Sequence, residues 1–196
     1  MKREFRILVA SVALCAVAFC ASAASAEEEA AAAPEGLKTT GFYFGGGIGG
    51  AVWDEFDDES FAWRAQVMYR ACKYFGAEVE WLDVSGAEST FGLTSVGLDA
   101  NGFNLSAVPM FPIGDKATLF AKVGLYLWDA DYDNAPGQTG EDLSFGIGGM
   151  YEIGSGWGLR AEWTRLMLDV RDDKINGFAG LNEDVDVFTV GGFFHY

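Results

Sequence analysis

Cysteine, histidine, proline and positive charge are all scarce in this sequence. Its 196 residues include three Cys, one His, four Pro and 13 Lys or Arg. So few Cys and His exclude a zinc ribbon and a disulfide-rich scaffold. The 29 Asp and Glu residues bring the formal net charge to −16. Because nucleic-acid binding depends on a basic surface that displaces counterions from phosphates, we expect no nucleic-acid partner.

Hydrophobic residues, aromatic residues and glycine are abundant. Half of the sequence is hydrophobic, 15% is aromatic and 26 residues are Gly. This hydrophobic content excludes a disordered chain. Glycine at this frequency, without a collagen period, is typical of closely packed or strongly twisted strands. Beyond the first 26 residues, no apolar run is long enough for a membrane helix and no repeat has solenoid spacing.

The N-terminus has the three parts of a secretory signal peptide. A basic start precedes an apolar stretch over residues 7–21, and Ala24, Ser25 and Ala26 form the cleavage-site pattern. The apolar stretch is too short for a membrane anchor, which is the alternative interpretation. The sequence therefore divides into a signal peptide (1–26), a flexible Ala- and Glu-rich tail (27–40) and a folded domain (41–196).

The folded domain alternates between apolar and polar residues with a period of two. Every odd position from 117 to 127 is apolar, whereas Thr118, Lys122 and Gly124 stand at even positions. This pattern predicts a strand with two different faces. Eight segments follow it: 41–53, 61–72, 76–83, 102–110, 117–128, 143–153, 157–166 and 185–196.

The connections between these segments alternate in length. Short turns are expected at 73–75, 111–116 and 154–156, and longer polar loops at 54–60, 84–101, 129–142 and 169–184. Eight strands joined in this way predict an all-β, eight-stranded antiparallel up-and-down barrel. Such a barrel is either a soluble lipocalin-like cup or a transmembrane barrel of an outer membrane.

The mixed face of the strands favours the transmembrane barrel. This face is rich in Gly, Ser and Thr, and its few charges balance, as a closed interior requires. We expect an interior ion-pair network of four bases and four acids: Arg64, Arg70, Lys122, Arg160, Glu78, Glu80, Glu152 and Glu162. Aromatic residues stand near the ends of the apolar face, as in a membrane girdle: Phe42, Trp63, Trp81, Trp157, Trp163 and Tyr196.

Three segments, over residues 42–47, 114–124 and 157–163, resemble the OmpA-like transmembrane domain and the wider porin-like family of small outer-membrane β-barrel proteins. The likeness covers about residues 41–196. It implies a multi-pass barrel in the outer membrane of a Gram-negative cell, surrounded by outer-membrane lipid and lipopolysaccharide. Because the sequence stops at the eighth strand, we do not expect the peptidoglycan-binding domain that OmpA-like members often append.

The last strand is similar to the family's signal for barrel assembly. Its aromatic C-terminus and the apolar residues on the same face carry this likeness: Phe188, Val190, Phe194 and Tyr196. The resemblance implies that the barrel-assembly machinery is a partner. It also implies interior ion pairs on the strands that carry Glu78 or Glu80, Lys122, Arg160 and Glu162.

The interior charges have two interpretations, a lining of a narrow pore or a paired plug. An eight-stranded barrel has an interior that side chains can fill, and Phe120, Tyr126 and Met150 narrow it further. We therefore expect a structural protein that contributes to envelope integrity. A narrow porin-like channel is the first alternative, and a loop-mediated adhesin or surface interaction protein is the second.

The long connections are strongly acidic. Residues 54–60 and 129–142 carry five acidic residues each, and residues 169–186 carry six. Divalent cations are therefore candidate partners of these loops, and a solvated, charge-repelling surface is the alternative. Residues 129–133 resemble the start of a calcium loop, but the Gly and Glu that such a loop needs at its sixth and twelfth positions are missing.

Catalysis is not expected. His195, the single histidine, stands at the C-terminus, where the last strand ends on the periplasmic side, so it lies at the wrong end for the lipid-modifying barrels that use a His at the outer rim. The chain also has too few Cys and His for a zinc set. We therefore predict no enzyme, no cofactor and no resident metal.

Overall fold

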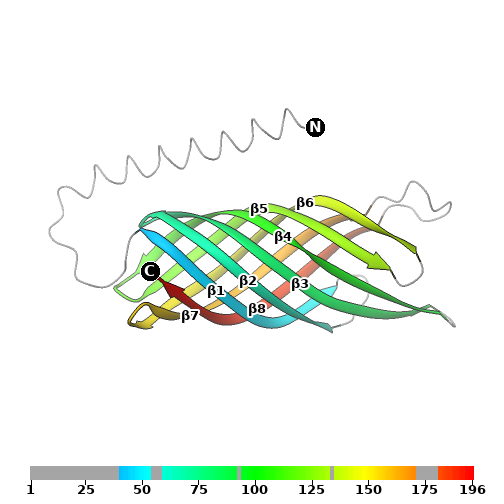
Figure 1. The fold of residues 1–196 in the computed structure, drawn as a ribbon, viewed down its shortest axis with the longest axis horizontal. Helices are drawn as coiled ribbons and strands as arrows, with labels where there is room; N and C mark the ends of the chain where they lie inside the picture. Colours follow the sequence, from blue (N-terminus) through cyan, green and yellow to red (C-terminus); the bar gives the residue numbers. More distant parts are fainter. Residues whose placement is uncertain (1–39, 54–58, 92–93, 133–134, 171–180) are drawn as a thin grey trace, which may run out of the picture.

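The computed structural model describes residues 40–53, 59–91, 94–132, 135–170 and 181–196, in which eight antiparallel strands close into one barrel (Figure 1). The strands are β1 (Gly41–Trp53), β2 (Glu59–Cys72), β3 (Phe75–Phe91), β4 (Thr94–Ile113), β5 (Ala117–Tyr132), β6 (Ala135–Gly154), β7 (Trp157–Val170) and β8 (Leu181–His195). Each strand pairs with its neighbours in the chain. This order confirms the predicted up-and-down barrel.

The barrel is closed by pairing of its first and last strands. Tyr43 of β1 lies opposite His195 of β8 at one end of this seam, and Trp53 lies opposite Val185 at the other. A closed barrel leaves no sheet edge with unpaired backbone groups, which is the condition for crossing hydrocarbon with strands. Among the described residues, no helix is long and apolar enough to span a membrane.

The period-two pattern places apolar side chains outside and polar side chains inside. Ile48 and Val190 are each 62% exposed on the outer wall, whereas Arg160 is 2% exposed inside. An outer wall of this kind is stable only where hydrocarbon covers it, because exposed apolar patches of this size are rare on soluble monomers. The sequence prediction that the mixed face points inward is confirmed.

Short turns join the strands at the end of the barrel where β1 begins and β8 ends, which we call the short-turn end (Figure 1). One of these turns joins β6 to β7 through Ser155 and Gly156, whose φ angles are 54° and 83°. A side chain at position 156 would be strained at this φ, and its Cβ would lie 2.8 Å from the His195 carbonyl oxygen. Glycine there lets the turn pass beside the end of β8.

Two of the predicted long loops are wrong, because most of their residues belong to strands. The sequence pattern predicts a loop over residues 84–101, but β3 continues to Phe91 and β4 begins at Thr94, with these two residues paired. Likewise, residues 129–142 lie largely in β5 and β6. Beyond a membrane, polar residues suit both faces of a strand, so the alternation fades although backbone pairing continues.

The remaining sequence predictions about connections and termini fall on residues that the structure does not describe. The signal peptide and tail lie in residues 1–39, apart from Thr40. Most of the first acidic loop lies in residues 54–58, and the central part of the last lies in residues 171–180. These predictions remain expectations.

Candidate functional site

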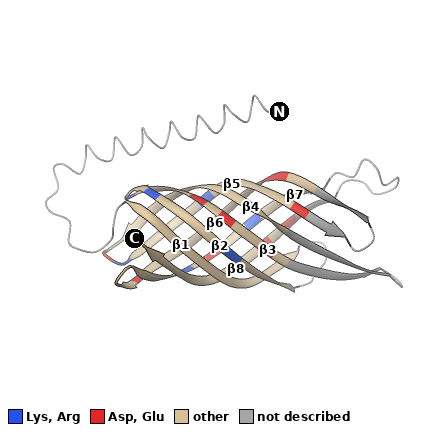
Figure 2. Cartoon of the chain, viewed as in Figure 1, with Lys and Arg blue, Asp and Glu red and all other residues tan. Residues whose placement is uncertain are grey.

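The inside of the barrel consists of three stacked layers of side chains. Along β5, the inward positions run from Phe120 through Lys122 to Tyr126, that is, from an apolar layer through a charged one to a second apolar layer. We call these layers the lower apolar layer, at the short-turn end, the central charged cluster and the upper apolar layer. Along β3 and β7, the charged positions are likewise followed by the upper apolar layer, at Leu82 and Leu166, whereas glycines, Gly76 and Gly158, stand at the level of the lower apolar layer. Figure 2 shows charged segments in the middle of the barrel as well as at its ends.

The central charged cluster contains three bases and three acids, all nearly inaccessible to solvent. Its members are Arg64 on β2, Glu78 and Glu80 on β3, Lys122 on β5, and Arg160 and Glu162 on β7. The three positive and three negative charges balance. A buried charge is tolerated only when opposite charges and hydrogen bonds replace its hydration, and this composition satisfies the first condition.

Each carboxylate of the cluster contacts at least two bases. For Glu80, the Arg64 Nη1 atom lies 2.9 Å from Oε2 and the Lys122 Nζ atom lies 3.0 Å from Oε1. For Glu162, Arg160 donates a 2.7 Å hydrogen bond from Nε to Oε2, and Arg64 and Lys122 also form ion pairs with it. The ion pairs therefore connect four strands across the barrel rather than two neighbouring strands.

Arg160 and Glu78 form the most directional pair of the cluster. Arg160 Nη1 and Nη2 donate to the two carboxylate oxygens of Glu78, the second bond at 3.0 Å, in the fork geometry that favours arginine over lysine. The guanidinium carbon also lies 4.3 Å from the centroid of the Phe120 ring, so it stacks on the lower apolar layer.

The three carboxylates lie close enough together to suggest a metal site. Oxygen atoms of Glu78, Glu80 and Glu162 all lie within 4.8 Å of one another. The Lys122 ammonium, however, contacts all three, at 3.8 Å from Glu78 Oε1 and at shorter distances from the other two. This ammonium already supplies the positive charge that a cation would bring, so the arrangement suits a lysine and not a metal ion.

Uncharged side chains add hydrogen bonds to the carboxylates of the cluster. Asn104 donates to Glu80 over 3.5 Å and accepts a 2.7 Å bond from the Ser144 hydroxyl. The Thr164 hydroxyl donates to Glu162 over 3.0 Å. These bonds satisfy carboxylate lone pairs that the bases leave open, which is the second condition for a stable buried ion network.

Glycines of the barrel wall leave the space that the interior side chains occupy. A Cβ atom at Gly148 on β6 would lie 2.5 Å from Cζ of Phe120 and 2.7 Å from Cβ of Glu162. A Cβ atom at Gly47 on β1 would lie 3.3 Å from Nε of Arg64. The high glycine content is thus needed where long side chains lie against the wall.

Two of the eight predicted network residues lie outside the central cluster. Arg70 and Glu152 are buried at the short-turn end, beyond the lower apolar layer. Arg70 donates a 2.7 Å hydrogen bond to the Lys73 carbonyl oxygen, so it anchors the β2–β3 turn. Glu152 lies 3.6 Å from the His195 Nε2 atom, with the Tyr43 ring beside that imidazole. His195 therefore faces inward at the end where the sequence places it.

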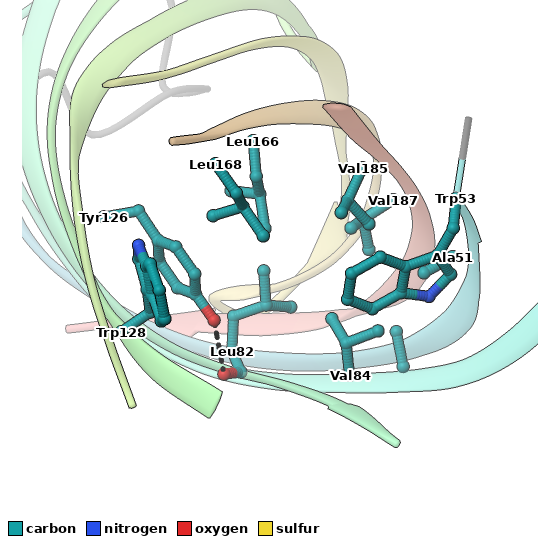
Figure 3. Close-up of a cluster of buried hydrophobic side chains, with 11 residues drawn as sticks. Ala51, Trp53, Leu82, Val84, Tyr126, Trp128, Leu166, Leu168, Val185 and Val187 are labelled. Carbon is teal, nitrogen blue, oxygen red and sulfur yellow. Dashed lines mark hydrogen bonds between the residues drawn. The ribbon is translucent and has the colours of Figure 1, made fainter. Parts of the chain in front are cut away.

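The two apolar layers were not predicted as layers. The upper apolar layer holds Ala51, Trp53, Ala62, Leu82, Val84, Tyr126, Trp128, Leu166, Leu168, Val185 and Val187, and its side chains point toward one another from the wall (Figure 3). The lower layer holds Tyr43, Met68, Val108, Met110, Phe120, Met150 and Phe193. The sequence contains part of the signal, because Phe120, Tyr126 and Met150 stand at inward positions, but not every strand has apolar inward residues at both ends.

The outer wall carries the predicted aromatic residues at two levels. Phe42 and Trp157 stand near the short-turn end, and Trp63 stands near the other end, all exposed. On β8, Phe188 and Val190 also point outward, and the exposed Tyr196 donates its backbone N–H to the Phe42 carbonyl oxygen over 3.2 Å. Phe194 packs against Trp157 with ring centroids 5.1 Å apart. The apolar face of the last strand is therefore continuous with the outer wall.

An ion pair marks the upper limit of the aromatic level. Arg165 points outward from β7 and forms an ion pair with Asp186 of β8, and Nε donates a 2.7 Å bond to it. The same carboxylate accepts a 3.1 Å hydrogen bond from the Trp163 indole. Other outward carboxylates near this level are Asp83, Asp129, Glu141 and Asp184.

A closed eight-stranded barrel with an apolar outer wall and a charged, filled interior defines the class of small outer-membrane barrel proteins. The family model for the outer membrane protein beta-barrel domain matches residues 11–191, so the chain belongs to that family. It is a protein of the outer membrane of a Gram-negative cell, and outer-membrane lipid surrounds its wall. No curated protein sequence matches it.

Solved structures of small outer-membrane barrels have the same fold. Neisserial surface protein A is 17% identical, with a TM-score of 0.64 over 82% of this chain and 100% of that one. OprG of Pseudomonas aeruginosa is 12% identical, with a TM-score of 0.58 over 82% and 98% of the two chains. Ail of Yersinia pestis is 12% identical, with a TM-score of 0.56 over 81% and 100%. At these identities the likeness shows the fold alone.

Proposed function

We propose that this protein is a structural barrel that contributes to the integrity of the outer membrane, with its interior closed by paired charges. The observation that carries this proposal is the order of the interior layers. The ion cluster lies between two apolar layers, so a solute crossing the barrel must pass three obstacles in series. An ion in either apolar layer would lose its hydration without gaining a partner, which is costly.

A narrow channel would need several of these contacts to break together. The upper apolar layer includes Leu82 and Tyr126, which are at most 1% exposed, and the Tyr126 hydroxyl lies 3.5 Å from the Leu82 carbonyl oxygen (Figure 3). Opening the central cluster would separate buried charges from their partners, at a cost of several kcal/mol per ion. The filled interior therefore favours the plug over the porin-like alternative.

Conductance in a planar lipid bilayer tests this proposal. The refolded protein and an Arg160→Ala variant are expected to give no steady channels, because the variant keeps both apolar layers. A Val79→Ala variant, altered on the lipid-facing wall, serves as the control, and heat-dependent electrophoretic mobility checks that each barrel is folded. Steady wild-type channels whose conductance changes in Arg160→Ala would instead make the protein a narrow porin.

A role in the envelope is tested in cells. We expect a strain that lacks the protein to become more sensitive to detergent and to bulky antibiotics, and the wild-type gene to restore resistance. An unchanged sensitivity would contradict the structural role. A strain whose only copy has substituted outer carboxylates but a closed barrel separates two causes of resistance. Retained resistance would attribute the role to the closed barrel, and lost resistance would attribute it to the outer surface.

A surface-binding role is the second candidate, and strand length favours it. β4 and β6 have 20 residues each, whereas about 9–11 suffice to cross a membrane. The barrel wall is therefore longer than the hydrocarbon is thick, and β3 and β4 reach beyond β1 and β2 at the end opposite the short turns (Figure 1). Loss of cell binding after deletion of the β3–β4 hairpin beyond Val84 would support an adhesin, and unchanged binding would exclude this hairpin as the adhesive segment.

The ligand of such a surface would differ from the one bound to Ail, whose structure was solved with the heparin analogue sucrose octasulfate. Outward residues near the upper rim of the described wall include Asp83, Asp129 and Glu141, which would repel a polyanion. We propose that divalent cations bridge these carboxylates to lipopolysaccharide phosphates. The bridge is contradicted if EDTA changes neither thermal stability nor lipid binding.

We also propose that the barrel-assembly machinery recognises the last strand. Support comes from the outward apolar face of β8, which ends in the exposed aromatic Tyr196. A Tyr196→Ala variant should accumulate less folded barrel in the outer membrane, although it refolds normally in detergent. Catalysis is not part of the proposal, because the single histidine is buried at the short-turn end, 3.6 Å from Glu152, and not at the opposite rim.

A further inference from the structure

A groove interrupts the outer wall at the β1–β8 seam. Its floor is the backbone of Gly46, Gly47 and Gly191, and its sides include Ile48, Trp63 and Val190. Its volume is about 580 Å³, which exceeds by several-fold the roughly 150 Å³ cavity that binds benzene in an engineered apolar core. The groove therefore has room for a chain-like apolar group.

The register of the strands explains the hollow. At one level, Gly46 lies between Ala65 of β2 and Gly192 of β8, so three small outward residues form one row. At the next outward level, Ile48 lies between Trp63 and Val190, which are large. The row of small residues beside the row of large residues produces a depression in the outer wall, bounded by bulky apolar side chains.

The groove lies toward the end opposite the short turns, and because outer-membrane barrels have short periplasmic turns, this is the outer half of the membrane. Trp63, on its side, pairs with Asp83 of β3, and Val52, four residues beyond Ile48, pairs with Asp186. Both carboxylates belong to the polar rim, so the upper end of the groove reaches the level of the outer-leaflet headgroups. The wall around it is the lipid-facing surface of an outer-membrane protein, and the groove continues that surface inward.

We propose that this groove binds one acyl chain of lipid A, the lipid of the outer leaflet, as a fixed constituent of the barrel. An acyl chain is a narrow flexible rod that can follow a concave apolar floor. A second copy of the protein fits less well, because a twofold axis along the membrane normal would set groove against groove and leave a void. The site does not depend on whether the interior conducts.

Native mass spectrometry of the detergent-refolded protein tests the site. The probes are hexa-acylated lipid A and a phosphatidylethanolamine, each added at the same molar ratio. We expect the wild type to retain one lipid A at a collision energy that removes the phosphatidylethanolamine. A Gly46→Leu variant fills the groove and should lower the lipid A affinity about tenfold, the change expected from losing roughly two methylene contacts.

Two further variants keep the test decisive. Gly149→Leu on β6 is the matched control, because an added Cβ there lies 3.6 Å from its nearest neighbour on the lipid-facing wall away from the groove. It should retain lipid A as the wild type does. Because a Cβ at Gly46 would lie 3.1 Å from the Arg64 carbonyl oxygen, a misfolded Gly46→Leu variant is replaced by Ile48→Ala, which removes one side of the groove and should also weaken retention.

Three results would overturn the proposal. Equal lipid A retention by the wild type, Gly46→Leu and Ile48→Ala would show that the groove is not the site. Equal retention of phosphatidylethanolamine and lipid A would contradict the assignment to the outer leaflet. A dimer mass that disappears in Gly46→Leu would identify a second copy as the occupant.

Discussion

Two arginines on the same strand make similar ion pairs in opposite surroundings. Arg160 points into the barrel with a side chain that is 2% exposed, and Arg165 points outward with a side chain that is 30% exposed. Each donates two hydrogen bonds to one carboxylate, Glu78 or Asp186. From hydrogen-bond geometry alone, the two ion pairs would be expected to contribute equally to stability. Burial separates them, because only the inner pair has exchanged its hydration for protein partners.

Removing the inner arginine should have the largest effect. An Arg160→Ala variant leaves Glu78 without its fork-shaped partner and takes one base from Glu162, so we expect a loss of about 3–5 kcal/mol in the free energy of unfolding. The measurement is reversible urea unfolding in lipid vesicles. Arg165→Ala, at the outer rim, should lose about 1 kcal/mol or less.

Equal losses from these two variants would contradict the comparison. They would mean that water reaches the central cluster and screens its charges as it screens the rim. A loss for Arg160→Ala that Arg160→Lys restores only in part would support the role of the guanidinium fork, because a lysine ammonium cannot donate to both oxygens of Glu78 in the same geometry.

The upper apolar layer offers a second comparison, between the two faces of β3. Leu82 points inward and is 1% exposed, and Val79 points outward and is 47% exposed. Leu82→Ala creates a cavity between rigid walls and should lower the free energy of unfolding by about 3 kcal/mol. In Val79→Ala, mobile lipid fills the space that the side chain leaves, so the loss should be roughly 1 kcal/mol or less. Vesicle unfolding measures both. A larger loss for Val79→Ala would mean that lipid contacts outweigh the packing of the interior.

The sequence allowed the faces of the strands to be assigned but not the partners of the charges. A charged Lys122 between apolar neighbours was enough to predict an inward position. Its contacts with Glu80 of β3 and Glu162 of β7 cross the barrel, so they depend on how far the strands are staggered. No local pattern encodes this stagger, and the predicted group of eight therefore included Arg70 and Glu152, which lie near the short-turn end.

The ends of the strands were less predictable than their centres. Within the hydrocarbon, one face must be apolar, and the alternation is strong. Beyond it, as in β3 after Val84, register shifts and polar composition remove the pattern, while the pairing of Ala87 with Leu98 continues the ladder. Long-range backbone pairing therefore sets strand length there, and the local preference of each residue does not.

Two adjacent glycines on β6 allow a smaller test of the same contrast between inside and outside. Gly148 faces the interior, where a Cβ would lie 2.7 Å from Glu162 Cβ, and Gly149 faces lipid, where the nearest atom would lie 3.6 Å away. Gly148→Ala should cost about 1–3 kcal/mol through overpacking, and Gly149→Ala should change stability by roughly 0.5 kcal/mol or less. The midpoint of vesicle unfolding resolves the difference. Equal effects would indicate that the interior can expand to accept a methyl group.

The coupling between Arg165 and Asp186 should be the smallest effect, and its salt dependence makes it informative. A double-mutant cycle with Arg165→Ala and Asp186→Ala is expected to give a coupling of about 0.2–1 kcal/mol. Raising the ionic strength from about 0.1 M to 1 M shortens the screening length from about 10 Å to 3 Å, so this coupling should fall toward zero. The same cycle on Arg160 and Glu78 should give a coupling that salt leaves almost unchanged, because ions do not reach side chains enclosed by two apolar layers. A salt-sensitive coupling between Arg160 and Glu78 would show that electrolyte enters the interior, and the closed plug would then have to be abandoned in favour of a channel.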